Sequence, residues 1–130
     1  MSVGILLVTH PGVGESLLGV ATRLFGPPPL QAECVEVGYD ADLDALLPQA
    51  SAALRRVDGG EGVLLLTDLF GATPSNFAQR IGQLGTPTRR VAGLSLPMLM
   101  RVFNYPDRDL AGIADSAAAG ARLGVVGDHG

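Results

Sequence analysis

The side chain best placed in this sequence to form a covalent intermediate is that of His10. The chain has no lysine, one cysteine, Cys34, and a single other histidine, His129, so it offers few nucleophiles. His10 closely follows a short apolar run, and Asp68 closely follows another. A carboxylate that accepts the imidazole Nδ1–H fixes the tautomer and leaves Nε2 free to attack an electrophile. We therefore predict that Asp68 orients His10 as a nucleophile.

The segment after Asp68 predicts an anion-binding helix end. Thr73 is a good N-cap residue and Pro74 suits the first helical position, so we expect a helix to begin here. The amide N–H groups of Ser75 and Asn76 then lie unpaired at the positive end of that helix, which binds anions such as phosphate. The residues expected to hold the anion, through backbone amides or hydroxyl groups, are Gly71, Ala72, Thr73, Ser75 and Asn76.

Each of these features also has an ordinary structural explanation. His10 can be a satisfied structural histidine with Asp68 as a loop residue, and Thr73 with Pro74 can be a simple helix cap. We favour the catalytic interpretation because the predicted fold brings His10 and Asp68 to one place.

Apolar runs alternate with helical patterns along the chain. Short continuous apolar runs are typical of buried parallel strands, and apolar residues at three- and four-residue spacing predict helices. Pro48 should kink or delay the second helix. The predicted strands cover residues 3–8, 33–37, 63–67 and 90–94, and Val125 with Val126 can form a short final antiparallel strand. The predicted helices cover residues 15–25, 43–57, 73–81, 96–103 and a last stretch from Asp107 or Asp109 to Ala121.

This alternation predicts a flavodoxin-like α/β domain, with a mainly parallel sheet in the order 2-1-3-4 between two layers of helices. Ligands of such folds bind beyond the carboxyl ends of the strands where the strand order reverses, here between the first and third strands. His10 and Asp68 follow those two strands, so their side chains should meet. A length of 130 residues fits one domain, which we place at residues 1–126, with residues 127–130 as a disordered tail.

Composition narrows the classes of function. A net charge of −4 argues against sequence-independent nucleic-acid binding. No apolar run approaches the ~20 residues of a membrane span, and the N-terminus lacks the charged region of a secretory signal. We therefore expect a cytoplasmic protein without membrane insertion. One cysteine excludes a disulfide framework, and we expect neither a metal site nor a cofactor.

A nucleophilic imidazole, an orienting carboxylate and an anion-binding helix end together suggest phosphoryl transfer through phosphohistidine. No lysine or metal cluster is present to hold a nucleotide triphosphate, so we expect a phosphoprotein as the donor. Three segments then carry a specific resemblance: Thr9-His10, Leu66–Asn76 (LTDLFGATPSN) and Gly93–Leu99 (GLSLPML). In order and spacing they resemble the mannose-family EIIA domain of the bacterial phosphoenolpyruvate-dependent sugar phosphotransferase system (PTS).

The resemblance covers the chain to about Val126 and implies a phosphotransferase component that works between proteins. His10 matches the histidine that accepts a phosphoryl group from phospho-HPr and passes it to an EIIB domain, here on a separate chain, for carbohydrate uptake. Asp68 matches the aspartate that bonds this histidine, and Thr73 a residue beside the phosphoryl group. Family members are typically homodimers that can exchange a C-terminal strand, for which only Val125 and Val126 qualify.

Three positions depart from the family's pattern. Pro11 stands where glycine is usual, which removes a backbone donor and biases His10 away from helical backbone. Ser95 replaces the commoner asparagine, and Ala72 replaces a frequent glycine. The phosphoryl-carrier subunit of dihydroxyacetone kinase has a similar domain, but we do not expect it to share the second motif, so we rank it below EIIA.

Some other side chains have expected roles outside the transfer step. Cys34 is expected to be a small core residue, Arg89 and Arg90 solvated side chains at the edge opposite the site, and His129 a spectator. The apolar rim expected to dock partner proteins consists of Phe70, Pro97 and Met98.

Three other functions stay open on the sequence alone. The chain can report phosphorylation state to a partner in a PTS that transports no sugar, because it carries no acceptor domain. It can bind a small anion in the same crevice without catalysis. A hydrolytic use of His10 and Asp68 is the weakest alternative, because the crevice lacks a convincing serine or cysteine nucleophile.

Overall fold

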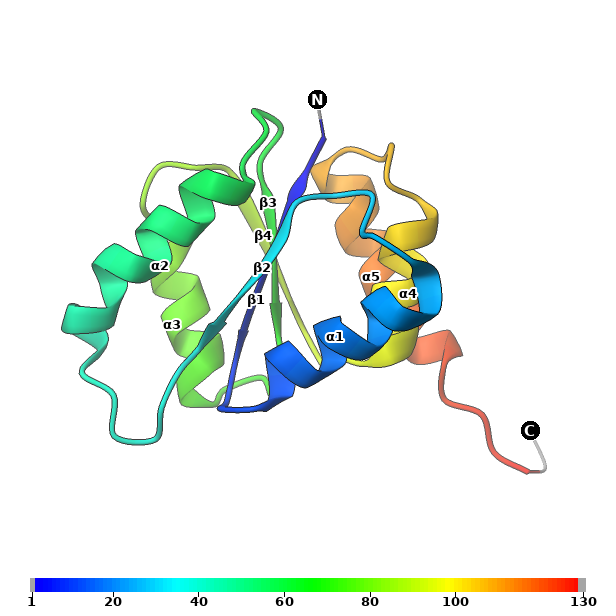
Figure 1. The fold of residues 1–130 in the computed structure, drawn as a ribbon, viewed down its shortest axis with the longest axis horizontal. Coiled ribbons are helices and arrows are strands. Elements are labelled where there is room, and N and C mark those ends of the chain that lie inside the picture. Colours follow the sequence, from blue (N-terminus) through cyan, green and yellow to red (C-terminus); the bar gives the residue numbers. More distant parts are fainter. Residues whose placement is uncertain (1, 129–130) are drawn as a thin grey trace.

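The computed structural model describes residues 2–128, which form three layers. Figure 1 views the sheet nearly edge-on, with the strands pointing downward and helices on both sides. The strands are β1 (Gly4–Thr9), β2 (Ala32–Glu36), β3 (Val63–Thr67) and β4 (Thr88–Ala92). The helices are α1 (Val13–Phe25), α2 (Leu43–Val57), α3 (Thr73–Ile81), α4 (Leu96–Asn104) and α5 (Leu110–Leu123).

The four strands are parallel and lie in the order β2-β1-β3-β4, which confirms the predicted topology. β1 and β3 occupy the centre, and every residue of both is buried, in line with their continuous apolar sequences. The edge strands β2 and β4 are only partly buried and contain charged residues. Val8 pairs with Thr67, so the residues after β1 and β3 leave the sheet side by side at the switch point.

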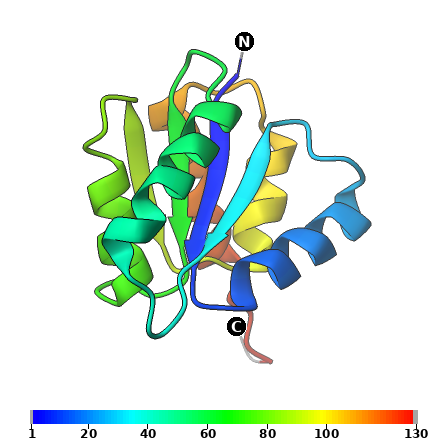
Figure 2. The same cartoon turned by 60° about the vertical axis from the view of Figure 1, so that its left-hand side comes forward.

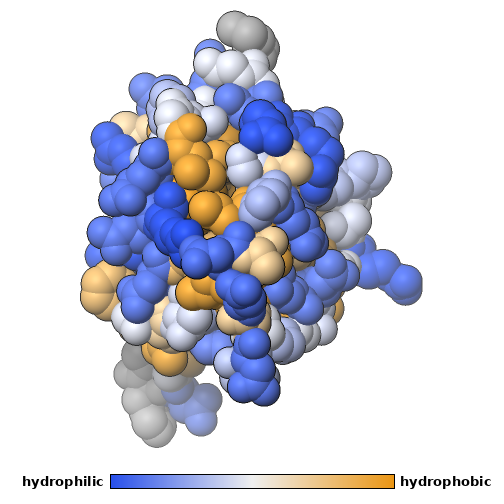
Figure 3. Space-filling view, turned by 90° about the vertical axis from the view of Figure 1, so that its left-hand side faces the viewer, coloured by the Kyte–Doolittle hydropathy of each residue, from blue (hydrophilic) through white to orange (hydrophobic). Residues whose placement is uncertain are grey.

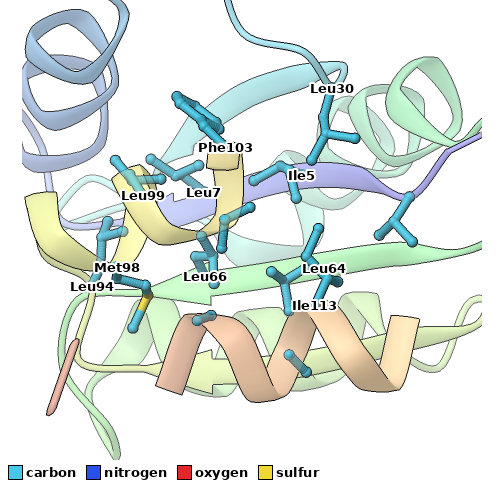
Figure 4. Packing of buried hydrophobic residues seen from close by; sticks show 14 of the residues in the cluster. Ile5, Leu7, Leu30, Leu64, Leu66, Leu94, Met98, Leu99, Phe103 and Ile113 are labelled. Carbon is cyan, nitrogen blue, oxygen red and sulfur yellow. The ribbon is translucent and has the colours of Figure 1, made fainter. Parts of the chain in front are cut away.

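Two apolar cores, one on each face of the sheet, hold the layers together (Figures 1 and 2). Under α1, α4 and α5, Leu7 and Leu66 of the sheet pack with Phe103 (Figure 4). Under α2 and α3, Leu65 packs in the same core as Phe77. Figure 3 looks onto the side of α2 and α3 and shows a mostly hydrophilic surface with apolar atoms between the polar ones. Each helix layer therefore buries one face against the sheet and gives the strand ends a rigid support.

Side-chain caps fix where three of the helices begin. Asp42 begins α2, Ser95 begins α4 and Asp109 begins α5, and each side-chain oxygen accepts a backbone N–H of the first turn. Ser95 thus supplies an acceptor at the position where asparagine is commoner. Pro48 lies inside α2, which nevertheless begins at Leu43, so the predicted delay is wrong because the Asp42 cap fixes the start.

Two predicted strands differ from the structure. β4 begins at Thr88 rather than Arg90 and ends at Ala92, because its pairing with β3 starts at Thr88. Val125 and Val126 belong to no strand in the described part of the chain, and they are 83% and 80% exposed. A short terminal strand needs a partner strand to pair with, and these residues pair with none in the described chain.

The end of the chain is described only in part. Residues 127 and 128 are exposed and belong to no helix or strand, whereas residues 129–130, and with them His129, lie outside the described residues. Within residues 2–128, no helix combines the length and the apolar character needed to cross a membrane.

Candidate functional site

The side chains of His10 and Asp68 meet at the switch point. His10 Nδ1 lies 2.8 Å from Asp68 Oδ2, and the His10 backbone N–H donates to the same oxygen over 3.0 Å. The other carboxylate oxygen accepts the N–H of Leu69 over 3.1 Å. The His10 side chain is 26% exposed, and its Nε2 makes no hydrogen bond within residues 2–128. The ring is therefore held at Nδ1, with Nε2 as its free nitrogen.

The contacts with His10 also keep Asp68 ionised. Partial burial raises the pKa of Asp68, but hydrogen bonds from the His10 backbone N–H and ring together lower it more, so the net pKa lies below the usual value. An ionised carboxylate here favours the tautomer that carries its proton on Nδ1. It also stabilises the positive charge that the ring gains when Nε2 is substituted.

Thr9 fixes the backbone on both sides of the His10 turn. Its Oγ1 donates to the His10 carbonyl and accepts the N–H of Gly14, each over 2.9 Å. A side chain at Gly14 would place its Cβ 2.9 Å from Thr9 Oγ1, so this close approach requires glycine. Gly12 supplies the positive φ of 83° that the turn needs. With glycine at these two positions, the turn accommodates Pro11.

The first turn of α1, which follows His10, has no unused amide. Every one of its first four N–H groups has an acceptor, which leaves this helix end with no backbone donor for a ligand. The acceptors for the N–H groups of Val13, Gly14, Glu15 and Ser16 are, in that order, the His10 carbonyl, Thr9 Oγ1, Glu36 Oε2 and the Gly12 carbonyl.

The first turn of α3 is different. Its N-cap is Ala72, which has no side-chain acceptor, so the prediction that Thr73 caps this helix is wrong. Thr73 and Pro74 instead occupy the first two helical positions, because the Ala72 backbone is already extended and carries the cap geometry. The N–H groups of Thr73 and Ser75 have no acceptor within residues 2–128, whereas that of Asn76, predicted to be unpaired, donates to the Ala72 carbonyl over 3.0 Å. This helix end therefore has two unused N–H groups, of which that of Thr73 belongs to an exposed residue.

The other groups at this helix end differ in exposure. Gly71 has a φ of 86° and open space around it, so its backbone is accessible. Thr73 is exposed, but Ser75 is fully buried. The Ser75 hydroxyl has no partner in the described chain, and neither has that of Thr67. Asn76 Nδ2 donates to the Gly71 carbonyl over 3.4 Å, which ties the helix to the loop before it.

The predicted rim is only partly present. Phe70 is 72% exposed and Pro97 is exposed, but Met98 is fully buried. Its assignment to the rim is wrong because the first turn of α4 directs Met98 into the core. Arg90, expected to be solvated, donates to the Ser75 carbonyl over 2.8 Å, and its guanidinium lies 5.5 Å from the Phe70 ring centroid. Arg90 therefore supports both the α3 end and the exposed ring of Phe70.

Tyr39 is a neighbour of His10 that the sequence reasoning missed. The centroids of the two rings lie 5.8 Å apart, with an angle of 32° between the ring planes. Tyr39 comes shortly after β2, the strand that pairs with β1 opposite β3. The predicted strand order is the signal that could have found it, because residues after β2 leave the sheet at the same edge as His10.

Cys34 is a second nucleophile type near this edge but in a different setting. It is half-buried in β2 and lines a groove of about 480 Å³ between α1 and β2. Burial raises the pKa of its thiol to about 12, with further increases from Glu15, Glu36 and Glu33. Cys34 is thus a neutral thiol. Within residues 2–128, the structure contains no group of three or more His, Cys, Asp or Glu side chains that could hold a metal ion.

The fold and site together define a parallel α/β domain in which a carboxylate-bound imidazole lies at the switch point, near a helix end with unused amides. The family model EIIA-man, described as the PTS system fructose IIA component, matches residues 4–118 of this chain. The chain belongs to this family, the IIA components of the sugar phosphotransferase system, whose members are phosphotransferase components.

Individual relatives agree with this assignment. The PTS system mannose-specific EIIAB component of Escherichia coli K12 is 31% identical over 114 residues, which are 84% of this chain and 33% of that protein. The chain thus spans about a third of the length of this curated relative. The mannose/sorbose-specific IIA subunit from Enterococcus faecalis has the same fold, with a TM-score of 0.85, 24% identity and coverage of 98% and 95% of the two chains. The PTS IIA protein associated with the fucose utilization operon of Streptococcus pneumoniae shows it too, with a TM-score of 0.79, 20% identity and coverage of 98% and 96%.

Proposed function

We propose that this protein is a phosphoryl carrier of the PTS, which accepts a phosphoryl group from phospho-HPr on His10 and passes it to an EIIB domain for carbohydrate uptake. One observation carries the proposal: Asp68 holds Nδ1 of His10 at 2.8 Å and leaves Nε2 without a partner in the described chain. Family membership supports the same role, because the family consists of PTS IIA components.

The transfer is an exchange of one N–P bond for another. Nε2 of His10 attacks phosphorus in line, the N–P bond of phospho-HPr breaks, and its electron pair returns to the donor's imidazole. Asp68 accepts from Nδ1 throughout and stabilises the positive charge on the ring as the new bond forms. Transfer to EIIB reverses these roles, with His10 as the leaving group. Such a step depends on positioning and electrostatics, which the fixed ring supplies.

The phosphoryl oxygens are held by the first turn of α3 in this proposal. The N–H of Thr73 is the primary donor, because Thr73 is exposed and this N–H has no acceptor in the described chain. The N–H of Ser75 also lacks an acceptor there, but Ser75 is fully buried. The accessible backbone of Gly71, the Thr73 hydroxyl and the Asn76 side chain complete the binding set. The Ala72 N–H already donates to the Leu69 carbonyl over 3.2 Å, so Ala72 contributes no free amide. Pro74 contributes no N–H, so the donors are spaced on alternate residues.

The remaining parts of the proposal concern partners and setting. Phe70 and Pro97 form the exposed docking rim, and the net charge of −4 suits docking to a carrier protein of complementary charge. The domain comprises residues 1–126, acts in the cytoplasm and forms a homodimer. The exposed Val125 and Val126 are then available to pair with a second copy.

The test is incubation with Enzyme I, HPr and phosphoenolpyruvate, followed by intact-mass measurement. We expect a mass increase of one phosphoryl group, which is lost in acid, because phosphohistidine is acid-labile. His10→Ala should abolish the increase, and the matched control His129→Ala, which removes the other histidine, should retain it. Labelling that persists in His10→Ala would falsify the assignment of the nucleophile.

The role of Asp68 is tested by Asp68→Asn in the same system. An asparagine can still contact the ring but has no charge to stabilise it, so we expect the rate of phosphoryl uptake to fall about a hundredfold or more. Rapid-quench kinetics measure this rate, and circular dichroism checks that the fold is retained. An unchanged rate in a folded variant would remove Asp68 from the mechanism.

A further inference from the structure

The loop after β2 brings an aromatic side chain next to the His10 ring. The loop that carries Tyr39 is tied to β1, because the Val37 N–H donates to the Thr9 carbonyl over 2.8 Å. The Ala41 N–H donates to the Gly38 carbonyl over 3.1 Å and closes a turn around Tyr39. The Tyr39 ring centroid then lies 5.8 Å from that of His10 at an angle of 32°. A two-point backbone anchor therefore presents this ring to the nucleophile.

The hydrogen bond to Asp68 alone leaves the imidazole some freedom. Asp68 Oδ2 holds the ring at one atom, Nδ1, and a single hydrogen bond tolerates tilting of the ring about that point. Such tilting moves Nε2, which lies across the ring from the tether. A neighbouring ring restricts this motion, and the tilted Tyr39 ring lies within the centroid separation at which aromatic rings interact.

We propose that Tyr39 is a positioning residue for phosphoryl transfer: its ring sets the plane of the His10 imidazole, so that Nε2 points at the incoming phosphorus. The proposal rests on the proposed function of His10 as phosphoryl acceptor. Tyr39 is 81% exposed, so its replacement leaves the apolar cores intact.

The test compares Tyr39→Leu with Tyr39→Phe in single-turnover phosphoryl uptake from phospho-HPr at increasing donor concentration. We expect Tyr39→Leu to lower the maximal rate constant about two- to tenfold, the range of an aromatic contact, and to leave the half-saturating concentration of HPr unchanged. Tyr39→Phe keeps the ring and should restore the rate. Tyr105→Leu is the matched control, because Tyr105 follows α4 at the opposite end of the sheet and is also exposed.

Two results would overturn the proposal. One is a Tyr39→Leu variant with the wild-type maximal rate, and the other is a raised half-saturating concentration at an unchanged maximal rate, which would make Tyr39 a docking residue. The proton NMR shift of the His10 ring gives an independent readout, since Tyr39→Leu removes the ring current that Tyr39→Phe keeps. Absence of labelling in the wild-type protein would instead contradict the proposed function, so the two failures are distinguishable.

Discussion

The N-termini of α1 and α3 flank the same histidine and have opposite hydrogen-bonding states. Both follow a central strand, and both present the positive end of a helix dipole to the switch point. In α1, each N–H of the first turn has an acceptor, including Thr9 Oγ1 and Glu36 Oε2. In α3, the N–H groups of Thr73 and Ser75 have no acceptor in the described chain. The start of α1 therefore has no backbone donor left for a ligand, whereas the start of α3 has two.

The α1 end holds the nucleophile in place, whereas the α3 end is proposed to hold the phosphoryl group. Three of the four acceptors of the α1 end belong to Thr9, His10 and Gly12, so the saturated turn fixes the backbone that carries the imidazole. The α3 end is fixed through a carbonyl instead: Arg90 donates to the Ser75 carbonyl, and the N–H groups of Thr73 and Ser75 stay without acceptors in the described chain. A helix dipole alone does not make an anion site, and unused donors are the second requirement.

The starts of the other helices show how α3 differs from them in side-chain capping. Asp42, Ser95 and Asp109 cap α2, α4 and α5 with their own side chains, whereas α3 begins at Ala72, which cannot. α1 also begins without a side-chain cap, at Gly12, but each N–H of its first turn finds another acceptor. Among the helices of the described chain, α3 is therefore the one whose start has neither a side-chain cap nor a full set of acceptors. Stability that a cap would add is missing at the one place where a free N–H serves the proposed chemistry.

Ala72→Asp tests the difference between the two helix ends most directly, because it gives α3 the side-chain cap that it lacks. The extended backbone at residue 72 suits an N-cap, so the new carboxylate should accept the Ser75 N–H and repel a phosphoryl group. We expect phosphoryl uptake to fall about a hundredfold, the effect of losing an oxyanion donor, while the free energy of unfolding rises about 1 kcal/mol. Rapid-quench labelling and urea denaturation measure the two effects.

Ala72→Asn is the matched control for Ala72→Asp. Asparagine also caps helices but carries no charge, so it should stabilise the fold to a similar degree and reduce uptake less. The difference between the two variants then reports the charge repulsion. If Ala72→Asp raised stability without slowing uptake, the α3 amides would have no part in holding the phosphoryl group.

The sequence was sufficient for those parts of the fold and site that depend on local pattern. The continuous apolar run of β3 has the predicted bounds, Val63–Thr67, because a fully buried central strand leaves no ambiguity in its pattern. The meeting of His10 and Asp68 followed from strand order, since adjacent parallel strands end at one edge. Asp109 was one of two expected starts of the last helix, and its side chain makes the cap.

The parts that sequence could not supply depend on side-chain direction between elements. Thr73 is a stronger capping type than Ala72, yet the chain turns one residue earlier. Met98 is buried rather than exposed because rotation of α4 about its axis, fixed by core packing, decides which face it shows. Arg90 reaches Ser75 and Phe70 from an edge strand whose inner face is set by register. Such contacts join residues distant in sequence, and local patterns do not encode them.

The smaller effect belongs to the α1 end, where Thr9→Val removes both hydrogen bonds of Thr9 Oγ1 and keeps the shape of the side chain. The Gly14 N–H and one bond to the His10 carbonyl are then unsatisfied in a buried position, so the free energy of unfolding should fall about 1–3 kcal/mol in urea denaturation. Uptake should slow less than in Ala72→Asp, because the donors at α3 are untouched. Glu36→Gln is the control, since it retains an acceptor for the exposed Glu15 N–H and should change stability by less than about 0.5 kcal/mol. If Thr9→Val stopped labelling of a folded protein as completely as Ala72→Asp does, the α1 turn would itself belong to the phosphoryl site, and the division of work between the two helix ends would not hold.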